Sequence, residues 1–123
     1  MMCKTILLAA LAAVLAGCAG RNNNEPIEAS AKVLEDLPGS YTFKTTVDDS
    51  VRYSTAVVTQ TAEGEYQISR VTVYGPVIYG FSLGEHAAVE SAELGSGAVT
   101  YQPGIKKTTI RFEKGDALCE LSK

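Results

Sequence analysis

The chain has 123 residues, of which 46% are hydrophobic and 20% are charged, with no Trp, one His and three Cys. This length predicts one small domain, because domains typically contain ~100–150 residues. The 14 acidic and 11 basic residues give a formal charge of −3. A mildly acidic chain lacks the positive field that binds a phosphate backbone, so we expect no nucleic-acid partner.

The first 17 residues have the pattern of a secretory signal peptide. Lys4 precedes an apolar run from Ile6 to Val14, and small residues follow the run. One cation, an apolar run and a small-residue boundary are typical of signal peptides. The run is too short for a membrane-spanning helix, which needs ~20 apolar residues.

The sequence Leu15-Ala16-Gly17-Cys18 resembles the lipobox of bacterial lipoproteins. The resemblance implies that residues 1–17 are removed and that Cys18 carries a diacylglyceryl group and an acylated amino group. Several acyl chains on one residue anchor a protein stably, whereas one chain gives only marginal binding. In lipoproteins of this kind, Asp directly after the lipidated cysteine tends to retain the protein in the inner membrane. Ala19 occupies that position here, so the resemblance implies sorting to the outer membrane, facing the periplasm or the cell surface. The alternative is an ordinary signal peptide that happens to contain a cysteine.

Residues 18–38 are expected to form the lipidated Cys18 and a tether. Residues 19–26 are polar and lack an apolar period, which is typical of a flexible spacer. The apolar residues from Ile27 to Leu37 allow either a short amphipathic helix, ended by Pro38-Gly39, or more spacer.

From Gly39 onward the hydrophobic period is two, which indicates half-buried strands. Gly-rich and Asp-rich turns separate eight short segments of this kind. The expected strands lie near 39–47, 51–59, 65–74, 77–83, 87–94, 98–102, 107–113 and 117–121. Residues 39–123 are therefore predicted to be an all-β domain, a small antiparallel meander that closes as a barrel or a two-sheet sandwich.

The alternation also predicts which side chains face the core. In the second segment Val51, Tyr53 and Val57 share the apolar phase and are expected to face inward. In the third segment the apolar phase slips after Ile68, which indicates either a bulge near Ser69-Arg70 or a strand buried on both faces.

The six tyrosines have two interpretations, since Tyr is favoured both in strands and in contact surfaces. Tyr41, Tyr53 and Tyr79 fall in the inward phase, which favours packing within the sheet. A binding stripe is the alternative.

Groups for catalysis and metal binding are scarce. His86 lies in a turn, and no motif places a nucleophile beside it. Cys3 would leave with the signal peptide and Cys18 would carry lipid, so Cys119 would be the one remaining thiol. One His and one Cys cannot form a structural zinc site, and the sequence has no Gly-rich phosphate loop. We expect no enzyme activity, no metal and no cofactor. Cys119, in the apolar phase of the last strand, is predicted to be a buried thiol or, alternatively, one available for an intermolecular disulfide.

The segments Ser96-Gly97-Ala98, Tyr101, Gly104-Ile105 and Phe112 through Ala117 resemble the C-terminal motif of the membrane-bound inhibitors of c-type lysozyme. Those inhibitors are small eight-stranded periplasmic lipoproteins, and the Ser and Lys of their motif meet the catalytic carboxylates of lysozyme. The resemblance implies a binding site of Ser96, Tyr101 and Lys114. The alternative is that Gly95-Ser96-Gly97 and Lys114-Gly115-Asp116 are only hairpin turns, because turn chemistry alone predicts those residues.

Gly39-Ser40-Tyr41 is similar to the Gly-x-Trp opening of lipocalin-like barrels, which implies a carrier of an apolar ligand. Together, these patterns predict a lipid-anchored envelope protein held at the membrane through Cys18. Its β domain is expected to act as a non-catalytic binding or assembly module for an envelope protein or glycan. Inhibition of c-type lysozyme and transport of an apolar ligand are the alternatives.

Overall fold

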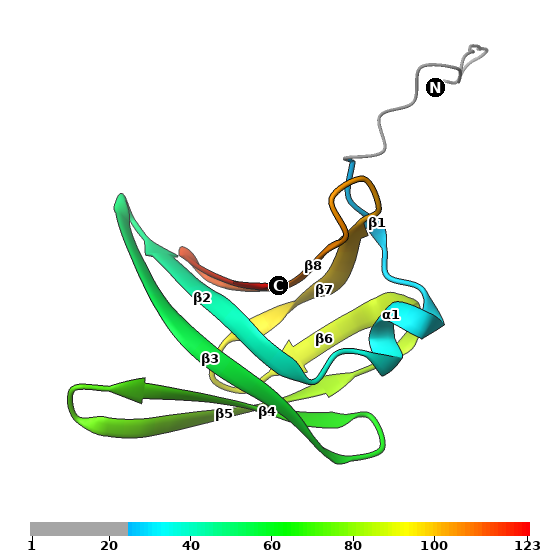
Figure 1. The fold of residues 1–123 in the computed structure, drawn as a ribbon. Coiled ribbons are helices and arrows are strands. Elements are labelled where there is room, and N and C mark those ends of the chain that lie inside the picture. The colour runs from blue at the N-terminus through cyan, green and yellow to red at the C-terminus, as the bar shows by residue number, and fades with distance from the viewer. Residues whose placement is uncertain (1–24) are drawn as a thin grey trace.

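The computed structural model describes residues 25–123, which form a closed antiparallel β-barrel of eight strands with one additional strand (Figure 1). The predicted all-β class is confirmed. The segment before the barrel contains β1 (Ile27–Glu28) and α1 (Ala31–Glu35), and a short 3-10 helix, η1 (Glu85–Ala87), follows β5. The barrel strands are β2 (Gly39–Val47), β3 (Ser50–Ala62), β4 (Glu65–Thr72), β5 (Gly75–Leu83), β6 (Ala88–Ser91), β7 (Gly95–Gln102), β8 (Lys107–Lys114) and β9 (Ala117–Ser122).

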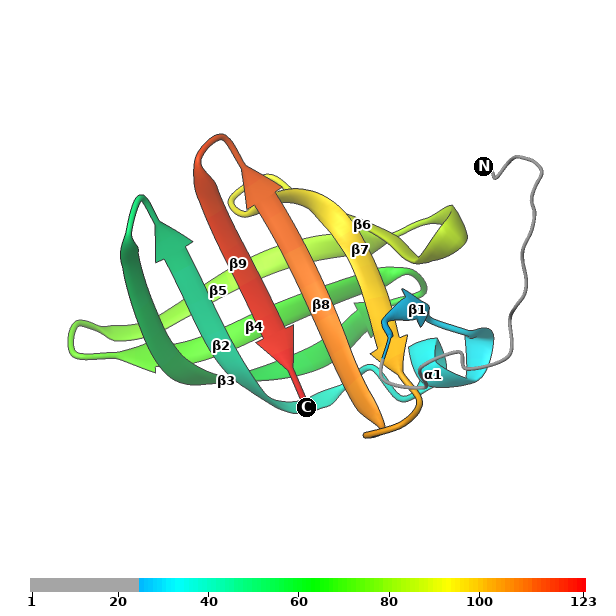
Figure 2. The ribbon, with the colours of Figure 1, turned by 90° about the horizontal axis from the view of Figure 1, so that it is seen from above.

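The barrel is a simple meander. Each strand from β2 to β9 pairs with the next along the chain, and β9 pairs back with β2 to close the cylinder (Figure 2). β6 is short, and it pairs with the end of β5 and with the first half of β7. β1 pairs with Thr100 and Tyr101 in the second half of β7. Closure covers much of the sheet edge, although β5 pairs with β6 only at Ser82 and Leu83.

One end of the barrel is plugged by the segment that precedes β2. Ser30 caps α1 by accepting a hydrogen bond from the Val33 amide, and Leu37, with no exposed surface, lies at the end of the core. The Tyr41 hydroxyl donates a hydrogen bond to the Leu37 carbonyl. Residues before Gly39 thus pack against the barrel, and the helical alternative for this segment is correct for Ala31–Glu35.

Large side chains fill the barrel interior. Tyr66 stacks on Phe81 with ring centroids 5.2 Å apart, and Phe81 meets Phe112 edge to face at 5.4 Å. The largest side chains with almost no exposed surface are Phe43, Phe112, Leu37, Ile68, Ile110, Leu121, Val58, Val89 and Val99. A carrier of an apolar ligand requires an interior cavity, so this packing does not support the lipocalin-like alternative.

The predicted inward phase of β3 is wrong. Tyr53 is 68% exposed, and Val51 and Val57 are also exposed. The buried residues of this strand are Ala56 and Val58.

The reason lies in the neighbouring strand. Tyr41 and Phe43 of β2 are buried, and their partners across the β2–β3 ladder are Ala56 and Ser54. A narrow barrel interior accommodates a large ring opposite a small side chain, because protein cores are filled to crystal-like density. The larger residues of β3 are therefore directed outward, although its own alternation favours the opposite.

The predicted bulge near Ser69-Arg70 is also wrong. β4 pairs regularly with both β3 and β5 across these residues, and the register shift lies in β3 between Gln60 and Ala62. The apolar phase slips because Arg70, not an apolar residue, takes the inward position after Ile68. Val71 consequently faces outward and is 78% exposed.

Candidate functional site

Some of the predicted features lie outside the described residues. The signal peptide and the lipidated Cys18 both precede residue 25. Within residues 25–123, no helix has the length and apolar character needed to cross a membrane.

Ser96 pairs across the β7–β8 ladder with Glu113, the residue before Lys114, so the structure brings Ser96 and Lys114 near each other but leaves Tyr101 apart. Ser96 faces outward near the start of β7, whereas Tyr101 is five positions later and so faces the opposite side of the strand. Lys114 ends β8, and its ammonium donates a 3.0 Å hydrogen bond to the carbonyl of Ala92 in the β6–β7 turn.

Carboxylates surround Ser96. Its partners across the two neighbouring strands are Glu90 of β6 and Glu113 of β8, and both acids line a shallow surface depression with it. Glu113 is paired with Arg111 at 2.9 Å. The Lys114 ammonium is hydrogen-bonded to the Ala92 carbonyl in the same depression, so a partner would meet charges of both signs there. The roles that the resemblance to lysozyme inhibitors implies for these residues stay a prediction.

His86 and Cys119 are the remaining groups that the sequence singles out. His86 is in a left-handed backbone conformation with φ 57°, and its Nδ1 lies 3.9 Å from a carboxylate oxygen of Glu28. Cys119 is buried, and burial raises the pKa of its thiol to about 12, with the charge of Arg70 acting in the opposite direction. A thiol with such a high pKa is unreactive at neutral pH. No group of three His, Cys, Asp or Glu residues suited to a metal occurs between residues 25 and 123.

The tyrosines divide into two groups. Tyr41, Tyr66, Tyr79 and Tyr101 lie in the inward phase of their strands, which confirms the expectation for Tyr41 and Tyr79. Tyr53 and Tyr74 are exposed, the latter to 97%. Simple sheet packing therefore explains four tyrosines, and two are left on the surface.

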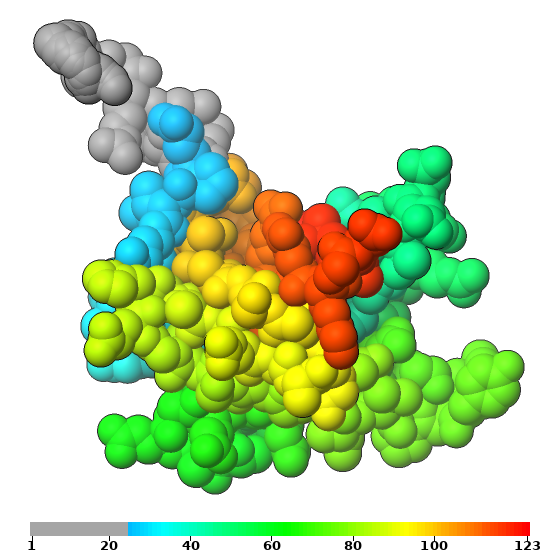
Figure 3. All heavy atoms as spheres, turned by 180° about the vertical axis from the view of Figure 1, so that it is seen from behind, coloured from blue at the N-terminus to red at the C-terminus, as the bar shows by residue number. Residues whose placement is uncertain are grey.

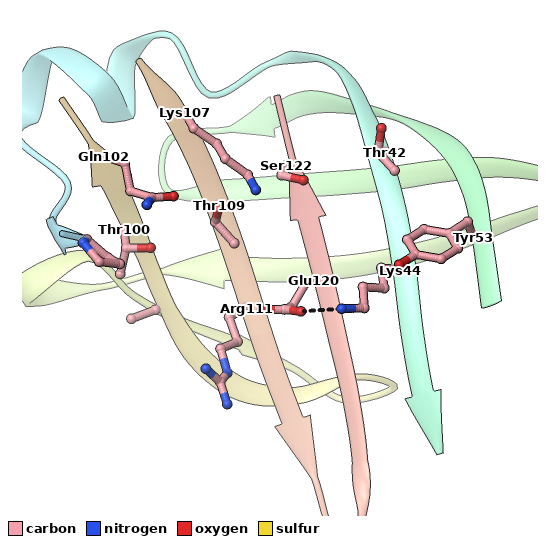
Figure 4. Close-up of a pocket in the computed structure, with 12 residues that line it drawn as sticks. Thr42, Lys44, Tyr53, Thr100, Gln102, Lys107, Thr109, Arg111, Glu120 and Ser122 are labelled. Atoms are coloured by element: carbon pink, nitrogen blue, oxygen red, sulfur yellow. Dashed lines mark ion pairs between the residues drawn. The ribbon is translucent and has the colours of Figure 1, made fainter. Parts of the chain in front are cut away.

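A polar groove lies on the outer face of the barrel. β2, β9, β8 and β7 curve so that their outward face is concave (Figure 1). The groove has a volume of about 450 Å³. Its lining residues are Pro26, Thr42, Lys44, Tyr53, Ala98, Thr100, Gln102, Lys107, Thr109, Arg111, Glu120 and Ser122 (Figure 4).

A row of hydroxyl groups crosses the groove through Thr42, Ser122, Thr109 and Thr100, and continues beyond the groove lining to Thr55. The strand register aligns one hydroxyl residue from each of five neighbouring strands, and these residues are Thr55, Thr42, Ser122, Thr109 and Thr100. We call this set the hydroxyl row. Neighbouring strands lie ~4.8 Å apart, so five strands present hydroxyls over roughly 19 Å.

A charged row lies beside the hydroxyl row. Its members are paired with one another across neighbouring strands and are, in strand order, Tyr53, Lys44, Glu120 and Arg111. Lys44 and Glu120 form an ion pair at 3.8 Å, drawn as a dashed line in Figure 4.

Cations outnumber acids in the groove. Arg111 pairs with Glu113 outside the lining at 2.9 Å. Lys107, next to the hydroxyl row, has no carboxylate partner among the described residues. The lining thus holds three cations and one acid, although the chain as a whole is acidic.

The sequence pattern alone does not predict the groove. Outward Thr and Lys residues are visible as the polar phase of single strands, but their alignment into rows depends on the register between strands. Register is set by pairing across the barrel, including closure of β9 on β2.

Comparisons of the chain with protein-family models, with curated proteins and with solved structures found no match, so they assign it to no family.

Proposed function

We propose that this protein is a lipid-anchored, non-catalytic binding module of the bacterial envelope that holds a glycan in its outer groove. The hydroxyl row carries the proposal. Each Ser or Thr hydroxyl both donates and accepts hydrogen bonds, as sugar hydroxyls do. A linear array of such groups, flanked by Tyr53 and the unpaired Lys107, suits a polar polymer more than an apolar ligand.

The composition of the groove favours binding over cleavage. Glycoside hydrolysis normally uses two carboxylates, one as acid and one as base or nucleophile. Glu120 is the sole carboxylate in the groove lining, and it is paired with Lys44.

Covalent geometry limits the distance between the groove and the proposed anchor. Pro26 lines the groove, and it follows Cys18 by eight residues. A fully extended chain spans at most ~3.6 Å per residue, so the Cα atoms of these residues lie at most roughly 29 Å apart. A lipid on Cys18 would therefore hold the groove close to the membrane surface.

Sedimentation with purified peptidoglycan sacculi tests the groove. Thr109→Val keeps the shape of the side chain and removes a central hydroxyl, so we expect about a threefold to tenfold loss of the bound fraction. Thr59→Val, on the exposed outer face of β3 away from the groove, is the matched control and should bind normally. Equal binding by both variants, or no sedimentation of the unsubstituted protein with sacculi, contradicts the proposed ligand.

Metabolic labelling with radioactive palmitate tests the anchor. We expect label in the unsubstituted protein and none in Cys18→Ala, which should also move from the detergent phase to the aqueous phase. Label retained in Cys18→Ala would rule out Cys18 as the anchor.

Inhibition of c-type lysozyme stays a prediction of the sequence resemblance. Calorimetric titration of soluble Ala19–Lys123 with a c-type lysozyme tests it directly. Tight binding that Lys114→Ala abolishes would replace the glycan proposal, whereas no heat at high micromolar protein would dismiss the resemblance.

A further inference from the structure

The barrel end opposite α1 is open. β3 and β4 pair only as far as Ala56 and Arg70, whereas the β2–β3 hairpin continues to Val47 and Ser50. The β4–β5 hairpin likewise continues past Arg70 to Thr72 and Gly75. Beyond Arg70 the two hairpins separate, and their tips project as two arms in Figures 1 and 2, while Figure 3 shows the β4–β5 arm projecting from the body.

A pocket of about 430 Å³ lies between the two arms. Its volume falls in the ~300–1,000 Å³ range of small-molecule sites. The lining residues are Thr45, Arg52, Tyr53, Ser54, Arg70, Thr72, Val73, Tyr74 and Val77. We call this pocket the barrel mouth.

Arg70 lies half-buried at the base of the mouth without a carboxylate partner. Its guanidinium carbon is 4.8 Å from the centre of the Phe43 ring. Nη1 and Nη2 donate long hydrogen bonds to the hydroxyls of Ser54 (3.4 Å) and Tyr79 (3.2 Å). Nε is buried and has no partner. Neutral hydroxyls and aromatic rings thus surround a full positive charge.

The charge of the mouth is opposite to that of the whole chain. Its lining contains two guanidinium groups, Arg52 and Arg70, and no acid, although the formal charge of the chain is −3. A partly buried cation with no counter-charge is unfavourable. An oxyanion supplies the missing partner, because the planar guanidinium fork matches carboxylate and phosphate groups.

Apolar side chains line the outer part of the mouth. Val73 and Tyr74, in the β4–β5 turn, are 93% and 97% exposed, and Tyr53 is exposed on the other arm. Large apolar groups gathered at an open pocket indicate a ligand with an apolar portion. The filled core below Phe43 confines such a ligand to the mouth.

We propose that the barrel mouth binds an amphiphile with an oxyanion head group, carboxylate or phosphate. The head group lies against Arg70 and Arg52, and the apolar part lies against Val73, Tyr74 and Val77. The mouth and the outer groove share only Tyr53 among their lining residues, so either proposal can fail without the other.

Calorimetric titration of soluble Ala19–Lys123, which retains every described residue, tests the proposal. The probes are decanoate and dodecyl phosphate below their micellar concentrations, with decanol and inorganic phosphate as the uncharged and tail-free controls. We expect both anionic amphiphiles to bind, and each control to bind at least about tenfold more weakly.

Two arginine variants locate the head group. Arg70→Gln should weaken binding of both amphiphiles by about tenfold or more. Arg111→Gln, which removes an arginine from the outer groove, should change it by less than about twofold. Equal binding by a folded Arg70→Gln protein overturns the site, and equal affinity for inorganic phosphate and dodecyl phosphate overturns the amphiphile.

Two further variants keep the test decisive if Arg70→Gln does not fold. Arg52→Gln and Tyr74→Ala change exposed residues of the arms, so we expect both proteins to fold. Each should weaken decanoate binding about threefold or more, the first through the head group and the second through the apolar part. Unchanged binding in both variants overturns the proposal.

Discussion

The two ends of the barrel differ in how their apolar side chains are covered and how their polar groups are paired. At the α1 end, Leu37 is fully buried, and the backbone carbonyls beside it have partners. Tyr41 donates to the Leu37 carbonyl, and the Lys123 ammonium donates to the carbonyls of Asp36 and Pro38. At the open end, Arg70 has a buried unpaired Nε, and Val73 and Tyr74 are almost fully exposed.

The difference teaches where stability and binding reside in this small domain. The plugged end follows the usual rules, with apolar groups buried and polar groups paired. The open end breaks both rules, and such local violations are expected at functional sites. Substitutions at the plugged end should therefore destabilise the fold, whereas those at the open end should affect binding more than stability.

The largest expected effect comes from Leu37→Ala. This change removes a fully buried side chain from the plugged end, so we expect a loss of about 3 kcal/mol in the free energy of unfolding. Urea unfolding measures the change. A loss below about 1 kcal/mol would mean that the plug is not part of the cooperative core.

Alkaline pH should destabilise the fold through buried groups. Burial raises the pKa of Cys119 from 9.0 to about 12 and also raises the pKa of Tyr41. Between about pH 9 and pH 12 the unfolded chain therefore binds fewer protons than the folded one, and stability falls as pH rises. Each group contributes a slope of about 1.4 kcal/mol per pH unit once it is fully ionised in the unfolded chain.

Unfolding midpoints in urea at pH 8 and pH 10.5 measure this dependence. Cys119→Ala should flatten it, and Tyr74→Phe, at an exposed position, should leave it unchanged. An equally steep dependence in Cys119→Ala would exclude the thiol as a source.

Arg70→Met tests whether the open end of the barrel sacrifices stability, because it removes the unpaired charge and keeps an unbranched side chain. We expect the free energy of unfolding to rise by about 1 kcal/mol, because apolar replacement of an uncompensated buried charge is commonly stabilising. Arg111→Met, at an exposed ion pair, should change stability by less than about 0.5 kcal/mol. A loss above about 1 kcal/mol in Arg70→Met would make Arg70 a structural residue.

The smallest effect is expected for Val73→Ala. The side chain is 93% exposed, so its truncation should change the free energy of unfolding by less than about 0.5 kcal/mol. A larger loss by urea unfolding would show that the open end contributes to the core, and the contrast between the two ends would fail.

The sequence predicts much of the fold because strand formation is a local property. Alternation in segments such as Tyr41–Val47 and Val77–Leu83 predicts strands that the structure confirms. The predicted inward phase of β5 is also correct, since Phe81 is buried and Tyr79 packs against the core. The prediction of a turn at Gly95–Gly97 is wrong, because these residues belong to β7.

Gly97 shows why the turn assignment failed. Glycine suggests a turn, but at Gly97 a Cβ atom would lie 1.7 Å from the Arg111 carbonyl oxygen. The strand position therefore requires glycine for close approach of β8, not for a reversal of the chain. Phe112 lies opposite Gly97 in the ladder, and its Cα would lie 3.2 Å from the same Cβ atom.

The sequence by itself determined the period of two, the main turns and hence an antiparallel all-β domain, since these follow from the conformational preferences of neighbouring residues. Only the tertiary structure decided which face of β3 points inward, because that depends on the volumes of Tyr41 and Phe43 on another strand. It also decided that Arg52 and Arg70, 18 positions apart, share one pocket without an acid. Distant residues meet through register and closure, which are properties of the whole barrel and leave no trace in any single strand.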